Sequence, residues 1–476
     1  MTGTLVEKPP RTRHWAALTV VLAATFMDLV DSTIVTIALP RIQAELGAGS
    51  AAAQWILAGY SLTFALVLIP GGRLGDIFGR KKVFLTGIIG FTIASAACAM
   101  APTAGALVAG RLAQGVLAAL MVPQVMSVIM VMFQDDRRLK AFGLYGAVLS
   151  LANVSGPVLG ALFTEYNVLG LGWRAIFWVN VPIGLLAIAC AIRYLPESRS
   201  ERPLRLDLTG IGLLSLASFA VMFPLIQGRE SGWPGWMIAL LVAAVPLIVL
   251  FAIAEHRRHR RDGSALVPLP LFRARSFSVG LVAMLVLFSG LASFFMVVAY
   301  EFQLGLGWSA LRTAVIVVGW PAGILLTTPV AQRLGLHHGR RLVAIGLAVL
   351  AVGTLALIYL LGTAGDEVAL WPVTLCVLFM GAGMGLCVSI LTGLVLAEVP
   401  APDAGAGSGV TNAALQLGTA LGVAITGLIF FGLTEAGTGA ADAGTITLWY
   451  NAGAFLVALL LVPLLPRAAH QPGNQL

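Results

Sequence analysis

The chain has 476 residues, of which 11% are charged and 59% are hydrophobic, and its formal net charge is +8. A soluble globular protein has about 25% charged residues, so this composition excludes an ordinary soluble enzyme. It indicates an all-helical protein that crosses a membrane many times. The four cysteines lie in apolar stretches, where we expect them to pack as small hydrophobic side chains.

The hydrophobic segments predict the transmembrane helices. A helix that crosses the bilayer needs about 20 mostly apolar residues, and by this measure the sequence predicts fourteen spans. In chain order they cover residues 15–39, 52–71, 83–101, 105–131, 141–163, 175–195, 208–227, 236–254, 278–300, 313–332, 342–362, 370–397, 408–433 and 447–466. The first span is too long for the hydrophobic part of a signal peptide, and we expect it to remain as a helix.

The basic residues predict the orientation of these spans. Of the 29 Lys and Arg residues, 24 fall in the terminal segments and loops of one side, four on the other side and one inside a span. Basic residues accumulate in cytoplasmic loops. We therefore expect a protein of the inner (cytoplasmic) membrane with both termini in the cytoplasm. The positive charge is spread over alternate loops instead of one stripe, which argues against nucleic-acid binding.

An internal repeat predicts the domain organisation. RLGDIFGRKKV at 73–83 follows the second span, and RLGLHHGRRLV at 333–343 follows the tenth. SGPVLG at 155–160 in span five is echoed by LGTALG at 417–422 in span thirteen. We predict two six-helix bundles, residues 1–200 and 277–476, and two inserted transmembrane helices with a cytoplasmic linker at 201–276. Two bundles of like orientation that rock around a central cavity are typical of transporters.

Three charged residues fall inside predicted spans: Asp28 and Asp31 in the first and Arg111 in the fourth. A charge at the centre of a membrane helix costs about 2.5–3.5 kcal/mol on insertion scales, so each should face a cavity or a partner. The two aspartates share one helix face at a spacing of three, and repulsion between them should make one easier to protonate. Asp31 and Arg111 lie at similar depths and could meet. A proton or substrate role is favoured over a purely structural pair.

Other polar and aromatic residues are candidates for contact with a substrate. Gln114 lies with Arg111, Gly115, Ala118 and Ala119 on one stripe of span four, along which a helix or a substrate could approach. Glu301 and Gln303 end span nine and could meet a substrate at a cavity mouth, although an exposed rim carboxylate is the simpler interpretation. The aromatic rings of Trp178, Tyr300 and Trp320 suit flat apolar compounds.

Span five contains SGPVLG, in which Gly156 and Pro157 combine a missing side chain with a missing N–H donor. This combination bends a helix and permits close contact with another. We favour a role in gating, with simple packing as the alternative.

The sequence resembles the 14-span drug:proton antiporter family of the major facilitator superfamily over essentially its whole length. GRLGDIFGRKK is similar to the cytoplasmic signature of that superfamily, and DSTIVTIALP (31–40), RLAQGVLAA (111–119) and ANVSGPVLGA (152–161) resemble its motifs in helices one, four and five. Departures from the family pattern are Ile77, Leu336, Ala152 and Ala161, and Asp28 lies outside the motifs. The resemblance implies a cytoplasmic gate that latches the two halves, formed by Gly72, Asp76, Gly79, Arg80 and Lys81, and a helix-five antiporter motif formed by Gly156, Pro157 and Gly160.

We therefore predict a proton-coupled exporter of lipophilic small molecules that works as a monomer in the bilayer, with no cofactor or metal besides the proton. Protons would be carried by Asp31 and Asp28 together with Arg111, and the substrate would meet Asp28, Gln114, Trp178, Tyr300, Glu301 and Trp320. The alternatives are a transporter of the same fold for lipid or metabolite export or uptake, and a non-transporting receptor. An ATP-driven pump is disfavoured because no lysine is followed by Ser or Thr, and an enzyme because no histidine lies inside a span.

Overall fold

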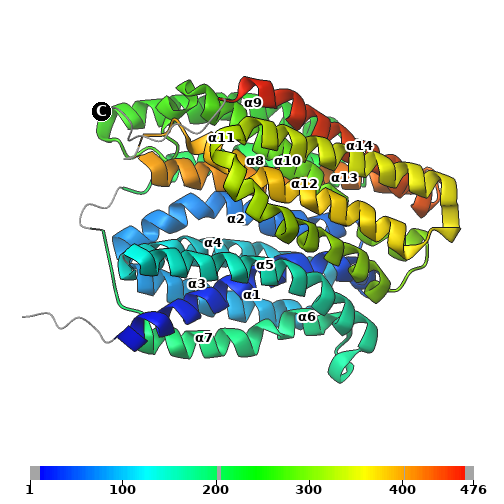
Figure 1. Cartoon of the computed structure of the whole chain (residues 1–476), viewed down its shortest axis with the longest axis horizontal. Coiled ribbons are helices and arrows are strands. Elements are labelled where there is room, and N and C mark those ends of the chain that lie inside the picture. The colour runs from blue at the N-terminus through cyan, green and yellow to red at the C-terminus, as the bar shows by residue number, and fades with distance from the viewer. Residues whose placement is uncertain (1–10, 134, 201–204, 401–402, 467–476) are drawn as a thin grey trace, which may run out of the picture.

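The computed structural model describes residues 11–133, 135–200, 205–400 and 403–466. These residues contain fourteen helices long and apolar enough to cross a membrane, which confirms the predicted all-helical fold. An even number of spans brings both ends of the described chain to one face, the left side of Figure 1, here called the terminal face. The other end of the helices is called the opposite face.

The first part of the chain forms one group of helices, drawn from blue to green in the lower half of Figure 1. They are α1 (Arg11–Leu46), α2 (Ser50–Phe78), α3 (Arg80–Ala99), α4 (Ala104–Met132), α5 (Asp135–Tyr166), α6 (Ala175–Trp178) and α7 (Asn180–Tyr194). Two short 3₁₀ turns, Val168–Gly170 and Gly172–Arg174, connect α5 to α6. Because α6 and α7 follow each other directly, they make up a single sixth span.

The last part of the chain forms the second group, in the upper half of Figure 1. It contains α10 (Arg275–Tyr300), a π-helical turn at Glu301–Gly305, α11 (Ala310–Ala364), a 3₁₀ turn at Gly365–Glu367, α12 (Leu370–Leu396), α13 (Ala404–Glu435), α14 (Ala440–Leu461) and a 3₁₀ turn at Val462–Leu464. The inserted helices between the groups are α8 (Leu208–Gln227) and α9 (Gly235–Asp262), followed by a 3₁₀ turn at Leu269–Arg273.

The two groups of helices meet along α2 and α13 and along α5 and α11. Near the opposite face, a Cβ on Gly427 of α13 would lie 2.1 Å from the side chain of Gln54 on α2. Toward the terminal face, a Cβ on Gly409 of α13 would lie 3.2 Å from Ile69 on α2. The helices therefore approach closely over most of their length, which small residues permit.

The inserted helices α8 and α9 pack on each other, and α8 also contacts α2 and α13. Most of the surface of α9 is open, with Val242, Val245 and Ile248 among its exposed apolar side chains. In a bilayer these side chains would face lipid, where apolar exposure carries no cost.

The second copy of the internal repeat differs from the first in its backbone. In the first copy Gly79 has φ of +107° and separates α2 from α3. In the second copy α11 continues through the repeat with a kink at His338, where φ is −123°. That conformation does not require glycine, so the chain reverses here without a left-handed residue, and α11 supplies both spans ten and eleven.

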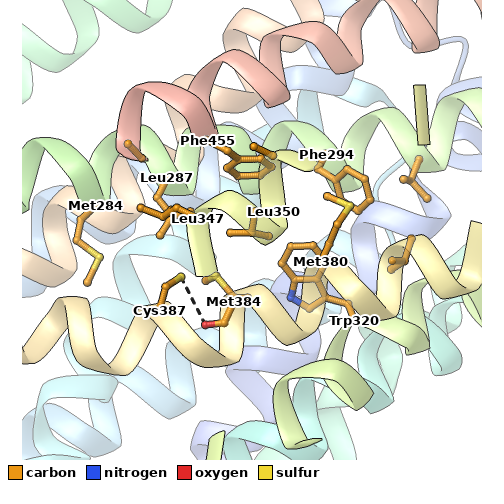
Figure 2. Close-up of a cluster of buried hydrophobic side chains, with 14 of the residues drawn as sticks. Met284, Leu287, Phe294, Trp320, Leu347, Leu350, Met380, Met384, Cys387 and Phe455 are labelled. Atoms are coloured by element: carbon orange, nitrogen blue, oxygen red, sulfur yellow. Dashed lines mark hydrogen bonds between the residues drawn. The ribbon is translucent and has the colours of Figure 1, made fainter. Parts of the chain in front are cut away.

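The core of the second group includes Trp320, which lies beside Met380 at one end of the side chains drawn in Figure 2. Its ring centroid lies 5.6 Å from that of Phe294 and 5.2 Å from that of Phe295, and the side chain is 5% exposed. We expected Trp320 to contact a substrate; in this structure the residue lies on α11, and its ring packs against α10. The backbone of Trp320 lies against Gly381 of α12, where a Cβ would come 2.1 Å from the Trp320 carbonyl oxygen.

Candidate functional site

The charged residues inside the first group of helices form a buried ion pair. Nη1 of Arg111 on α4 lies 2.5 Å from Oδ2 of Asp31 on α1, and both side chains are at most 1% exposed. The Arg111 guanidinium also donates from Nε to the carbonyl of Ile56 on α2, at 3.1 Å. A buried ion pair is tolerated when hydrogen bonds satisfy its remaining groups. The pair therefore ties α1, α2 and α4 together at one point.

Neutral polar side chains complete the coordination of Asp31. Gln114 donates from Nε2 to Oδ1 of Asp31 at 3.1 Å and accepts from Arg111 at 2.8 Å. Asn180, the first residue of α7, donates to the same Asp31 oxygen at 2.7 Å and to the hydroxyl of Ser95 on α3 at 2.9 Å. The Asp31 carboxylate is thus the acceptor at the centre of a network that spans five helices.

The second aspartate has a different partner. Tyr60 on α2 donates its hydroxyl proton to Oδ1 of Asp28, and the Arg111 guanidinium lies 4.3 Å above the Tyr60 ring. Asp28 and Asp31 therefore share a helix face without sharing a partner. Tyr60 links the two, because its hydroxyl contacts one carboxylate and its ring contacts the cation that pairs with the other.

The charge of Asp31 determines how stable this arrangement is. When a proton binds to Asp31, the charge that neutralises Arg111 disappears, and a buried cation without its partner is strongly unfavourable. Arg111 must then find another anion or water, which favours a rearrangement of the helices that it ties together. None of these residues forms a metal-ligand cluster, and the described residues contain no group of three or more potential metal ligands.

Helix α5 covers the Asp31 region through its glycines. A Cβ on Gly156 would lie 1.9 Å from the hydroxyl oxygen of Thr33 on α1. A Cβ on Gly160 would lie 2.7 Å from the carbonyl oxygen of Ile34. The helix containing Pro157 can therefore pack directly against the α1 turn that follows Asp31, so that α5 and α1 are in contact there.

The signature loop between α2 and α3 bonds to the end of α7 and to the residues that follow it, within the same bundle. Arg80 forms an ion pair of 2.9 Å with Asp76, and its backbone N–H donates to the carbonyl of Ser198 after α7. The backbone of Lys81 donates to Glu197, and its ammonium donates to the carbonyl of Ile192. Gly79 has no room for a side chain, because a Cβ would lie 2.4 Å from Glu197, whereas Gly72 is only in loose contact with Pro123.

The expected latch between the two halves is not formed by these bonds in this structure. In the second repeat, Arg340 likewise donates to carbonyls of Pro463 and Leu465 after α14. Each loop thus holds the last helix of its own bundle. Arg73, near the end of α2, bonds outside its own bundle: it donates to the carbonyls of Arg205, Ser264 and Ala265 in the inserted segment.

At the opposite face, three hydrogen bonds join the two groups of helices directly. The Tyr300 hydroxyl donates to Gln43 at 2.6 Å, Gln303 donates to the carbonyl of Ile37 at 3.0 Å, and the Leu311 N–H donates to Glu165 at 3.1 Å. We call these three bonds the opposite-face seal. In the loop after α8, Arg229 strengthens it by bonding to Ser50 of α2 and to the carbonyl of Phe431 of α13.

Glu301 does not lie on an exposed rim. Its side chain is buried, with the residue 1% exposed, because the π-helical turn Glu301–Gly305 directs it toward α14. The interpretation of an exposed rim carboxylate is therefore wrong.

Of the remaining candidates, Trp178 is half-buried at the junction of α6 and α7, and Tyr300 is buried against Phe430 and Phe431.

Asn180, Tyr60 and Ser95 were not predicted as site residues. Their only signal in the sequence is a polar side chain within an apolar span, as in FWVNVP around Asn180. Such a side chain can also bond to the backbone of its own helix. Only the packing of α2, α3 and α7 around Asp31 distinguishes them.

Fourteen spans in two groups of six with an inserted pair, and a buried ion pair in the first group, define a multi-pass membrane protein of the transporter class. The pattern of the Major Facilitator Superfamily matches residues 21–423 and 280–475. The chain belongs to this superfamily, which consists of transporters and not of enzymes.

Several relatives are described as exporters or resistance proteins. The chain is 39% identical to a probable actinorhodin transporter of Streptomyces coelicolor, covering 90% of this chain and 75% of that one. It is 34% identical to a puromycin resistance protein of Streptomyces alboniger, with coverages of 95% and 90%. It is 31% identical to a multidrug efflux pump of Mycolicibacterium smegmatis, with coverages of 92% and 88%.

Solved structures share the fold at low sequence identity. A POT family peptide transporter in an auto-inhibited form superposes with a TM-score of 0.68 at 16% identity, covering 96% of this chain and 99% of that one. A D-xylose-proton symporter superposes with a TM-score of 0.65 at 17% identity, with coverages of 95% and 98%. Both confirm the major facilitator fold.

Proposed function

We propose that this protein exports lipophilic small molecules, such as antibiotics or other secondary metabolites, in exchange for protons. The observation that carries the proposal is the fully buried ion pair between Asp31 and Arg111, because an intramembrane carboxylate with a cationic partner is the typical group of a proton pathway. The relatives described as acting on actinorhodin, puromycin and multiple drugs support the substrate class.

Proton binding to Asp31, or to Asp28, would weaken the hold of the carboxylates on Arg111 and favour one orientation of the transport cavity. Substrate and proton would then compete for the same acidic region. A ligand shifts a conformational equilibrium only by its difference in affinity for the two states, and neutralisation of Asp31 supplies such a difference. Gln114, Asp28 and the half-buried Trp178 are the proposed substrate contacts near this region.

We further propose that the chain works as a monomer in the cytoplasmic membrane, with both termini in the cytoplasm. The opposite-face seal then closes the outer side of the membrane, away from the cytoplasm. Residues 1–200 and 277–476 would rock against each other. The signature loop with Gly72, Asp76, Gly79, Arg80 and Lys81 would act as the cytoplasmic gate, and the α5 motif with Gly156, Pro157 and Gly160 would serve as a pivot. Tyr300, in the seal, would meet a substrate only after the seal opens.

The variant Asp31→Asn tests the proposal in inside-out vesicles. A pH gradient should drive a transported compound into vesicles that contain the wild-type protein. Asp31→Asn should abolish this accumulation while the amount of inserted protein stays the same. The matched control Glu367→Gln removes an exposed carboxylate at the opposite face and should transport normally. Retained accumulation by Asp31→Asn would refute the proton role of this residue.

The same vesicles separate the alternative functions. A panel of growth-inhibiting compounds, compared between cells with and without the protein, first identifies a compound to measure. Accumulation in inside-out vesicles indicates export from the cell, whereas loss from loaded inside-out vesicles indicates uptake. A receptor would move no compound in either direction.

A further inference from the structure

The second group of helices contains a buried carboxyl group that the Asp31 network does not use. Oε1 of Glu301, in the π-helical turn that ends α10, accepts a hydrogen bond of 2.9 Å from the Thr445 hydroxyl on α14. Its other oxygen, Oε2, is buried and has no hydrogen-bond partner. An unsatisfied buried polar atom is rare in a native structure and calls for an explanation.

The neighbouring helix is shaped to accept this side chain. A Cβ on Gly444 of α14 would lie 2.6 Å from Cβ of Glu301 and 2.7 Å from Oε2. Only glycine therefore fits opposite Glu301. The turn itself is π-helical, a distortion that is found frequently at functional sites.

The charged groups around Glu301 do not neutralise it. Within the described part of the chain no salt bridge reaches its carboxyl. The nearest acidic group on α14 is the exposed Asp442, which carries the same charge. On α11, Arg312 lies over the Trp308 ring, and on α1, Arg41 pairs with Glu45. A buried carboxylate without a counter-ion is strongly unfavourable, whereas the neutral acid is not. The closed structure therefore suits Glu301 only in its protonated form.

Glu301 is also placed where the two bundles meet. The preceding residue, Tyr300, bonds to Gln43 of α1, and Gln303, two residues later, bonds to the carbonyl of Ile37. These are two of the three bonds of the opposite-face seal. A change of charge at Glu301 would displace the turn that positions both of them.

We propose that Glu301 is a second proton-binding group of this transporter, which holds the opposite-face seal shut while it is protonated and lets the seal open when it ionises. The inference rests on the proposed function, in which the opposite face is the outer side of the membrane. A proton that arrives from outside would bind to Glu301 in the open state and permit closure. An acidic outer solution keeps Glu301 protonated and therefore favours the closed seal. An alkaline outer solution favours the ionised carboxylate, which is stable only when water reaches it, and therefore favours the open seal.

The distance between the two bundles at the opposite face tests this inference. Spin labels are attached to Ala106→Cys on α4 and Thr363→Cys on α11, both exposed at that face, after the four native cysteines have been replaced by alanine. In liposomes, the distance between the two labels in the wild-type background should be longer in alkaline buffer than in acidic buffer. Glu301→Gln, which cannot ionise, should keep the short distance in both. The control Glu367→Gln, at an exposed carboxyl of the same face, should behave like the wild type.

Two outcomes would overturn the inference: a lengthening in Glu301→Gln equal to that of the wild type, or a wild-type distance that does not respond to pH. Thr445→Val gives an independent check, because it removes the hydrogen bond and keeps the carboxyl. It should shift the pH at which the distance changes, and an unshifted midpoint would count against the proposed site. Failure of proton-driven export by the wild type would instead refute the proposed function, whatever the labels report.

Discussion

Asp31 shows how much a single side chain can organise in an apolar bundle. Its carboxylate accepts hydrogen bonds from Arg111, Gln114 and Asn180, so α4 and α7 are both held to α1 through one group. Inside the membrane such bonds have little competition from water, and Oδ1 of Asp31 depends on the two neutral donors Gln114 and Asn180. The site is therefore sensitive to its neutral members as well as to its charges.

Asn180→Ala should reduce proton-driven transport about tenfold or more, because a hydrogen bond to a charged group contributes about 1.5–3 kcal/mol. Initial rates in inside-out vesicles measure the effect. Asn412→Ala is the matched control, since the Asn412 amide bonds only to the Ser408 carbonyl of its own helix among the bonds described. Equal rates for the two variants would show that Asn180 does not serve the Asp31 network.

The sequence predicts part of this site. Asp28, Asp31 and Arg111 are recognisable because charge in an apolar span is costly, and helical rise alone places Asp31 and Arg111 at similar depths. Asn180 and Tyr60 are not recognisable, because a neutral polar residue in a span carries little cost and its partner lies on another helix. Glu301 is misjudged for a related reason: its burial depends on the π-helical turn and on Gly444, about 140 positions away, which no local pattern records.

At the scale of the helices, glycines decide how closely neighbours approach. Gly156 and Gly146 lie on the same helix, but a Cβ on Gly156 would overlap with Thr33 of α1, while a Cβ on Gly146 would meet nothing within 4 Å. The same substitution should therefore have opposite effects at the two positions.

Gly156→Ala should destabilise the protein by about 1–3 kcal/mol, the usual cost of overpacking. Gly146→Ala should be neutral or stabilising by up to about 1 kcal/mol, because alanine favours the helix. Thermal unfolding in detergent, with the two variants compared side by side, measures the difference. A midpoint for Gly156→Ala that is not below that of Gly146→Ala would show that α5 does not need to contact α1 closely.

The signature loop and the inserted helices form a second structural unit at the terminal face. Arg73 donates to three backbone carbonyls of the inserted segment, and Glu255 of α9 accepts from the backbone of Val267 at 2.7 Å. Arg258 pairs with Asp207 at 3.5 Å, which caps the start of α8. The Arg73 bonds attach the inserted segment to α2 at the terminal face, and the other two contacts hold the segment together.

Arg73→Gln should loosen this attachment, because a glutamine cannot reach three carbonyls at once. In inside-out vesicles, trypsin should then cleave faster at the arginines around residues 257–261, which lie beside the segment that Arg73 holds. Lys82→Ala, at an exposed position of the same loop, is the control. Unchanged cleavage in Arg73→Gln would show that the linker is held by other contacts.

At the scale of the whole molecule, hydropathy and the internal repeat are sufficient to predict fourteen spans, because the bilayer imposes their length. The contacts of the signature loops cannot be predicted in this way. Both repeats carry a basic residue at the same place, Arg80 and Arg340. The backbone N–H of Arg80 bonds to Ser198 after α7, whereas the guanidinium of Arg340 bonds to Pro463 and Leu465 after α14. Which partner such a residue selects depends on where α7 and α14 end in space.

The two bundles carry their acidic groups at different places: Asp28 and Asp31 inside the first, and Glu301 at the opposite-face end of the second. If protons move through the molecule as proposed, the first site couples them to substrate and the second couples them to the seal. Export then follows from the order in which the two sites load and release protons.

Proton movement during transport tests the central claim most directly. Purified protein is placed in liposomes that contain a pH-sensitive dye, and a transported compound is added on one side. For the wild type, flow of the compound in one direction should move protons in the other, and for Asp31→Asn both signals should vanish while the protein remains folded. If Asp31→Asn moves protons and compound in the same ratio and at the same rate as the wild type, the buried ion pair does not couple them.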